Sequence, residues 1–179
     1  MFQYLGFSAI SCISSMTSLT ITNGILIDNI KSEYYLGRDI PGQMVSLITS
    51  LYLSYRYKSN PLRLGLITAS IFPLSIGIDL SAGRSKDPEL LLLAGSILRG
   101  ISFVGPVGAH TTVIVNISRN VNPSLLGNKN TIFNSLGATI GISSGLFLSK
   151  YFDGTKECNA ILFSFMYPVA LYAAWRKYI

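Results

Sequence analysis

The sequence predicts an all-α integral membrane protein, in which residues 1–179 form one multi-pass domain of about six transmembrane helices. Composition is the first reason: the mean hydropathy is +0.46, and only 12% of residues are charged, against about a quarter in soluble proteins. The second reason is the run Leu90–Asn116, in which Arg99 is the one formally charged side chain. As a helix this run would be ~40 Å long, which exceeds the ~30 Å hydrocarbon core of a bilayer.

Apolar runs separated by short polar connections recur along the chain, which is the third reason. The predicted helices are Phe2–Ile27, Pro41–Tyr57, Pro61–Gly83, Pro88–Asn116, Thr131–Tyr151 and Asn159–Trp175. The polar loop Asp28–Ile40 follows the first helix, and Pro41 suits the first turn of the second. Pro73 predicts a kink in the third helix. The second and sixth runs are near the lower limit of about 17 residues for a span, so five spans or a re-entrant segment is the alternative.

Six spans would place both termini on one side of the membrane. The connections on that side carry basic residues, such as Arg63 and Lys129, without acidic ones, whereas those on the other side mix both signs. Because basic loops favour the cytosol, we expect cytosolic termini. The sequence does not identify the membrane.

Small and polar residues recur at helical spacing on several of these helices. The stripes are Ser8, Ser11, Ser15, Ser18 and Thr22; Gln43, Ser46, Ser50, Ser54 and Tyr57; and Thr68, Ser75 and Asp79. Gly137, Gly141 and Gly145 form two overlapping GxxxG units on the fifth helix. Such stripes let helix backbones approach closely in lipid, so we interpret the glycines as a packing face. The serine stripes fit either helix packing or a hydrated path.

The fourth predicted helix carries the sharpest candidate for a ligand site. Arg99, Pro106 and His110 share one face, and Ser102 flanks it. Pro106 should bend the helix and free a backbone carbonyl. A buried arginine is expensive in a membrane and marks a functional site by default. The alternatives are a structural arginine and a histidine that is satisfied by its helix neighbours.

Two further charged residues complete the list of ligand-path candidates. Lys129 lies near the expected path after the fourth helix. Asp79 is the natural counter-ion for Arg99, but it lies near the end of the third helix, whereas Arg99 lies ~15 Å inside the fourth. We therefore expect depth to keep Asp79 and Arg99 from pairing directly.

Other classes of function lack sequence support. The chain has no HExxH, no GxSxG, no pair of intramembrane aspartates and no metal-spaced cluster of cysteine and histidine. We expect no enzyme activity, no cofactor and no metal. The basic residues are dispersed through short loops, which fits lipid headgroups and not nucleic acid. The expected partner is the lipid bilayer.

The motifs also resemble the root UVB-sensitive family along nearly the whole chain. FQYLGFSAISCISSMTSLTITNGILI is similar to its Y-x-x-x-Q-x-x-S-S-x-T segment, DIPGQM to its D-G-x-G-Q-[LM] turn, LRGISFVGPVGAHTTVIVN to its K-A-I-x-G-V-A-x-G-A-T-R-A-A-L-T-x-H helix, and NPSLLGNK to its N-M-A-D-[VL]-x-A-K loop. Arg99 then falls on the family's lysine and His110 on its arginine. The resemblance implies the membrane core of a multi-pass protein linked to UV-B responses and vitamin B6 homeostasis. The family's acidic F-A-D-x-x-N-D segment has no acidic counterpart at 67–78.

A second resemblance is architectural. Arg99-Gly100 in a fourth helix, followed by a glycine-rich fifth helix, is similar to one six-helix half of a major-facilitator transporter. Such a half needs a partner to enclose a path, which implies a homodimer or another membrane protein. Two functions remain: a carrier or binding protein for a small anionic metabolite, and a structural or adaptor membrane protein.

Overall fold

The structure, a computed structural model, describes residues 2–30, 39–56, 60–118 and 122–179, and these residues form helices without a strand. The helices are α1 (Phe2–Asn29), α3 (Asp39–Arg56), α4 (Pro61–Ala69), α5 (Phe72–Ala82), α6 (Pro88–Ile117), α7 (Pro123–Tyr151), the short 3₁₀ helix η2 (Asp153–Thr155) and α8 (Lys156–Trp175). The all-α prediction is confirmed.

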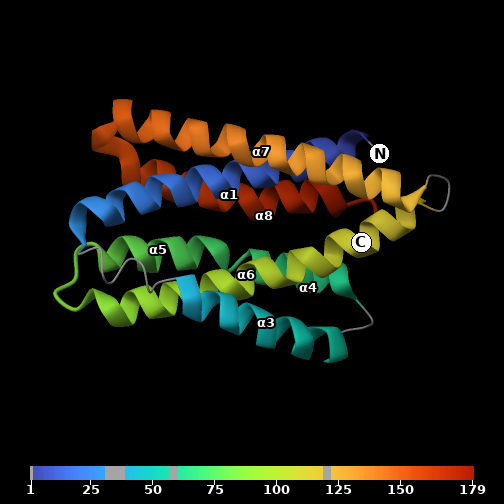
Figure 1. The fold of residues 1–179 in the computed structure, drawn as a ribbon, viewed down its shortest axis with the longest axis horizontal. Coiled ribbons are helices and arrows are strands. Elements are labelled where there is room, and N and C mark those ends of the chain that lie inside the picture. The colour runs from blue at the N-terminus through green and yellow to red at the C-terminus, as the bar shows by residue number, and fades with distance from the viewer. Residues whose placement is uncertain (1, 31–38, 57–59, 119–121) are drawn as a thin grey trace.

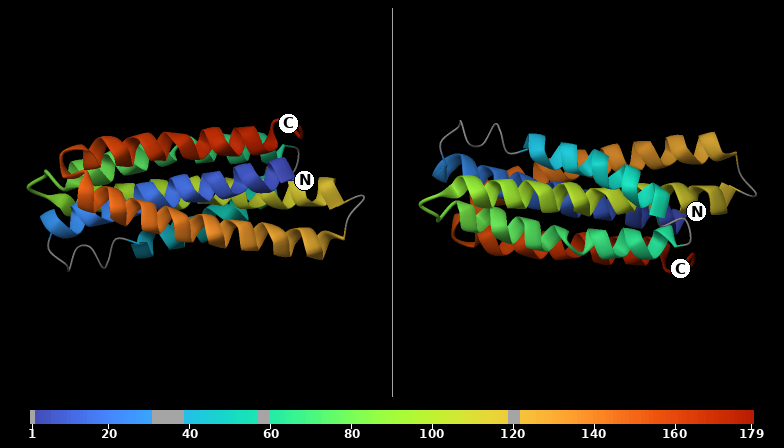
Figure 2. Two further views of the ribbon diagram at one scale, coloured as in Figure 1. Left: turned by 90° about the horizontal axis from the view of Figure 1, so that it is seen from above. Right: turned by 90° about the horizontal axis from the view of Figure 1, so that it is seen from below.

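The helices form two layers that run along the same axis (Figure 1). One layer holds α1 between α7 and α8, and the other holds α6 between α3 and the consecutive pair α4–α5. Most helix–helix contacts lie within a layer, and α5 and α8 make the largest contact between layers. The N- and C-termini lie at the same end of the bundle (Figure 2).

Close backbone approach holds α1 against α7. A Cβ added to Gly137 would lie 2.7 Å from the carbonyl oxygen of Ala9, and one added to Gly141 would lie 2.6 Å from that of Ile13. Gly145 meets Thr20 in the same way. The structure thus places the glycine stripe against α1, in the role of a packing face.

The apolar core is built from residues of α1 and of α4 to α8, and its aromatic centre lies where α5, α6 and α8 meet. The rings of Phe72, Phe103 and Tyr167 pack on one another with centroids 5.1–5.7 Å apart. Trp175 is fully buried at the end of the core that lies near the termini. Aromatic packing therefore joins the two layers along the edge formed by α5 and α8.

Proline placement explains the break in the third predicted helix. Pro73 has no amide hydrogen to donate to Ala69, and the helix is interrupted at Ser70 and Ile71, between α4 and α5. The predicted kink is confirmed. Pro106, in contrast, does not break α6, which continues to Ile117.

Two predicted boundaries are corrected. The fifth helix begins at Pro123, not at Thr131, because the Asn122 side chain accepts a hydrogen bond from the Ser124 amide at 3.0 Å and Pro123 suits the first turn. The stretch NPSLLGNK is therefore not a loop. The sixth helix likewise begins at Lys156, before the predicted Asn159.

Five of the described helical segments are long and apolar enough to cross a membrane. They are α1, α4 together with α5, α6, α7 from Ser124 onward, and α8 together with η2. The second predicted run, now α3, is not among them, because polar residues such as Gln43 and Ser46 lower its hydropathy. The predicted bundle of about six helices is confirmed: among the described residues, five have the length and hydropathy of a span, and α3 is the shorter, more polar sixth.

Candidate functional site

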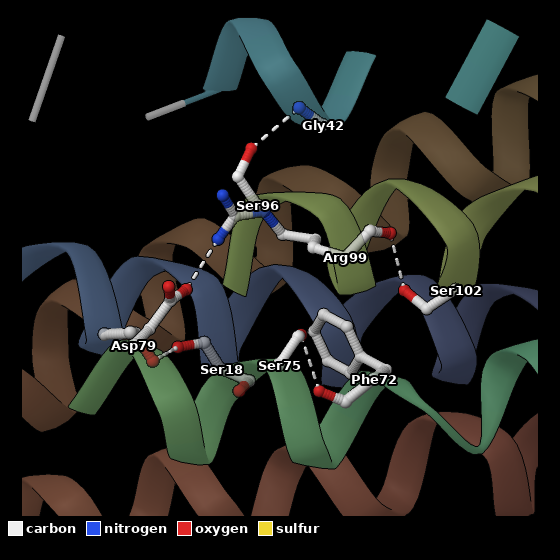
Figure 3. A network of polar contacts seen from close by, with 9 residues as sticks. Ser18, Gly42, Phe72, Ser75, Asp79, Ser96, Arg99 and Ser102 are labelled. Carbon is white, nitrogen blue, oxygen red and sulfur yellow. Dashed lines mark hydrogen bonds and ion pairs between the residues drawn. The ribbon is translucent and has the colours of Figure 1, made fainter. Parts of the chain in front are cut away.

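Arg99 and Asp79 form a direct ion pair inside the bundle. Nη1 of Arg99 donates to Oδ2 of Asp79 at 2.7 Å, and their side chains are 9% and 0% exposed (Figure 3). The expectation that depth separates these two residues is wrong. Removing one partner alone would leave the other charge buried and unpaired, so the two side chains depend on each other.

The geometry of the turn before α6 accounts for this error. The amides of Arg84 and Ser85 donate to the carbonyls of Ser81 and Ala82, so the backbone keeps rising beyond the end of α5 before it reverses. The Asp79 carboxylate consequently lies beside Gly95, where an added Cβ would be 2.2 Å from Oδ1. Arg99 then needs to reach back by only one turn, in the direction that helical side chains already point.

The first turn of α3 is held against the middle of α6. The amide of Gly42 donates to Oγ of Ser96 at 2.8 Å (Figure 3). A Cβ on Gly100 would lie 2.1 Å from the Gly42 carbonyl oxygen. The hydrogen bond and the close approach of Gly42 to Gly100 together fix the start of α3 against α6.

The start of α3 lies beside the first third of α6. Ser96 is ~12 Å along α6 from its first residue, Pro88, at the usual rise per helical residue. An amino-terminal helix end carries a partial positive charge. This partial charge faces the same region as Arg99.

A cavity of about 250 Å³ lies between α1, α3 and α6. It is lined by Leu19 and Asn23 from α1, by Gly42, Gln43 and Ser46 from α3, and by Ser96, Arg99, Gly100 and Phe103 from α6. The lining thus combines one guanidinium and several amide and hydroxyl groups with an aromatic ring. Such a mixture can orient a small polar ligand within an otherwise apolar bundle.

The remaining predicted candidates on α6 lie away from this cavity. Ser102 donates to the carbonyl of Arg99 at 2.7 Å, and Pro106 is buried beyond it. His110 is hydrogen-bonded through Nδ1 to the Tyr4 hydroxyl at 2.9 Å, and its ring packs edge-on against Trp175. These contacts join α1, α6 and α8 near the termini, so His110 has a packing environment and is not near Arg99.

Lys129 is half-buried in the amino-terminal part of α7, outside the set of residues that line the cavity. Asp79 is also outside that set, and it contacts the cavity-lining residue Arg99. Of the six predicted ligand-path residues, Arg99 is the one that lines the cavity.

The serine stripe of α1 contributes to packing. Ser8 donates to the Asn134 side chain on α7 at 2.9 Å, and Ser18 donates to the Ala160 carbonyl on α8 at 2.7 Å. Ser11, Ser15 and Thr22 donate to carbonyls of α1 itself. On the third helix, Thr68 and Asp79 both lie against α6, as their shared face predicts.

Sequence reasoning missed Ser96, Gly42 and Gly100 as site residues. Their signal is weak, because small residues are common in membrane helices and identify a contact only once the partner is known. A further signal was available in Pro41-Gly42-Gln43, a helix start with small and polar residues that follows the charged loop Asp28–Ile40.

Gly100→Ala is expected to move α3 away from α6. The added methyl group would meet the Gly42 carbonyl, which is backbone and cannot rotate away. We expect destabilisation of about 1–3 kcal/mol in thermal or denaturant unfolding of the purified protein. Gly108→Ala is the matched control on the same helix, because nothing lies within 4 Å of its added Cβ; an equal effect of both changes would contradict the contact.

The described part of the chain contains no group of three or more histidine, cysteine, aspartate or glutamate residues that could hold a metal ion. Its buried charged pair, polar helix start and five membrane-length helices define a multi-pass α-helical membrane protein with a polar cavity inside the bundle. Comparisons with protein-family models, with characterised proteins and with solved structures found no match.

Proposed function

We propose that this protein binds a small metabolite with an anionic group in the cavity between α1, α3 and α6, and carries it across the membrane. The observation that carries the proposal is the position of Arg99, a buried cation that lines a cavity inside an apolar bundle. An arginine at this depth is costly, and membrane proteins place such residues along substrate paths.

Two features support an anion in preference to a cation. The guanidinium offers planar paired donors that match a carboxylate or phosphate. The amino-terminal end of α3, with Gly42 and Gln43 in the lining, adds a partial positive charge from the same side. The resemblance to the root UVB-sensitive family adds phosphorylated forms of vitamin B6 to the ligands to be tested. An enzyme activity is not part of the proposal.

A structural or adaptor role is the second candidate, and the hydrogen bonds of α1 favour it. Thr17 donates to the Gly141 carbonyl and Ser18 to the Ala160 carbonyl, so polar groups of this helix serve helix–helix contacts. In that case the cavity is a packing defect without a ligand. A homodimer, as the similarity to half of a major-facilitator transporter implies, is compatible with both candidates.

Ligand-dependent thermal stabilisation of the purified protein tests the proposal. We expect at least one compound from a panel of short carboxylates, inorganic phosphate and phosphorylated B6 vitamers to stabilise the protein. At a ligand concentration of one hundred times Kd, binding would raise the free energy of unfolding by about 2.7 kcal/mol. Gln43→Leu should weaken the effect, because Gln43 lines the cavity, and Lys129→Gln should not. Stabilisation that is equally strong in both variants would place the ligand elsewhere and contradict the proposal.

A further inference from the structure

The cavity lies near one edge of the two layers, with a buried inner wall and a rim on α3. Figures 1 and 2 place α3 and α7 at the same edge, one in each layer. Among the described residues, α3 packs extensively on α6 and only sparsely on any other helix. At the opposite edge α5 and α8 pack together and close the bundle. The two layers are therefore joined on one side and separate on the side where α3 lies.

The residues that surround the cavity follow the same asymmetry. Ser96 and Arg99 at its inner wall are buried, whereas Gln43 on α3 is exposed and Ser46 is half-buried. The neighbouring side chains Met44 and Leu47 are 60% and 68% exposed and apolar. A polar interior thus continues outward into an apolar surface of α3 that faces lipid.

Depth and size limit what can enter. The cavity is level with Ser96, ~12 Å along α6 from its start, which lies within the hydrocarbon when a ~30 Å core is centred on helices of this length. Its volume of about 250 Å³ is below the ~300–1,000 Å³ of pockets that enclose drug-sized ligands. It is large enough for a polar headgroup, while the rest of a longer molecule would remain outside.

We infer that the ligand is a single-chain anionic amphiphile of the fatty-acid type, which enters sideways from the bilayer beside α3 and places its carboxylate beside Arg99. This inference rests on the proposed function, because it takes the cavity to be an anion site. The carboxylate reaches the guanidinium and the amino-terminal end of α3, and the hydrocarbon chain lies along Met44 and Leu47 in the lipid. No water-filled path to the cavity is needed for such a ligand.

Photolabelling in nanodiscs of neutral phosphatidylcholine tests the inference. The probe is a fatty acid with a photoactivatable diazirine in its chain, and the labelled residues are mapped by mass spectrometry. Labelling is expected to concentrate on the peptides that contain Ser46 and Phe103. Ser46→Trp, which fills the cavity from α3, should lower it about tenfold or more, equivalent to at least one decade in affinity.

Leu74→Trp is the control, because it places the same side chain on an exposed apolar position of α5, at the opposite edge of the bundle, and should leave labelling unchanged. Gln43→Phe, at the more exposed rim of the cavity, is a second blocking variant if Ser46→Trp fails to fold. A fatty alcohol with the same diazirine should label these peptides at least several-fold less, since it lacks the charge that Arg99 attracts.

The outcomes separate this inference from the proposed function. The inference of an amphiphilic ligand is contradicted if labelling is spread evenly over all lipid-facing helices. It is also contradicted if neither blocking variant reduces the labelling. In that case, thermal stabilisation by butyrate, a water-soluble carboxylate, tests whether the cavity binds anions at all. If butyrate stabilises the wild-type protein but not Ser46→Trp, the cavity is an anion site whose ligand comes from water. If neither the probe nor butyrate acts at the cavity, both ideas fail.

Discussion

Arg99→Leu is expected to prevent the folded protein from accumulating in the membrane. The change strands the Asp79 carboxylate, which is fully buried and pairs with Arg99 at 2.7 Å. Breaking one side of a buried ion pair typically costs 3–5 kcal/mol, about as much as a small protein has in reserve. We expect low abundance in the membrane fraction and a lower unfolding temperature of whatever protein can be purified.

The double variant Asp79→Leu/Arg99→Leu should recover much of this loss, because replacing both partners by apolar residues removes the stranded charge. The control is Arg84→Leu at the exposed pair of Arg84 with Glu157, where water already solvates both groups and little change is expected. Normal abundance of the single Arg99→Leu variant would show that the ion pair is not needed for folding.

Gly141→Leu is expected to separate α1 from α7. A Cβ at this position would lie 2.6 Å from the Ile13 carbonyl oxygen and 2.8 Å from Cβ of Met16, so even alanine is crowded and leucine has no space. Overpacking of this kind costs about 1–3 kcal/mol or more. The hydrogen bond from Thr17 to the Gly141 carbonyl, 3.1 Å long, would be lost as the helices move apart.

Denaturant unfolding of the purified protein, beside its abundance in the membrane fraction, measures this effect. Gly127→Leu on the same helix is the control, because nothing lies within 4 Å of its added Cβ. Tolerance of leucine at both positions would contradict the close approach of α1 and α7.

Hydropathy and a few local sequence signals predict the helices of this fold. The apolar runs gave the helices and their order, Pro73 gave the break between α4 and α5, and the spacing of Gly137, Gly141 and Gly145 indicated a packing face. These features depend on local sequence and on the bilayer, and so they can be read without knowledge of which helices are neighbours.

The candidate site was harder to predict, because it depends on the register between helices. The pairing of Asp79 with Arg99 was rejected on helix depth, since the extra rise at Arg84 and Ser85 cannot be read from hydropathy. Similarly, nothing in the sequence states that Ser96 accepts the amide of Gly42. The sequence placed Arg99 and His110 on one face of α6 and proposed that both line a ligand path. Arg99 does line the cavity, whereas His110 lies farther along the helix among aromatic side chains.

The contact between Gly42 and Ser96 has a consequence for biosynthesis. The two residues are 54 positions apart, and the acceptor is made after the donor. While the chain emerges from the ribosome, the start of α3 therefore has no contact with α6 until that later helix has been made. Because α3 is also less apolar than the five membrane-length helices, it gains less than they do from entering the bilayer alone. We expect α3 to wait at the membrane surface or in the insertion machinery, and to take its final position after α6 arrives.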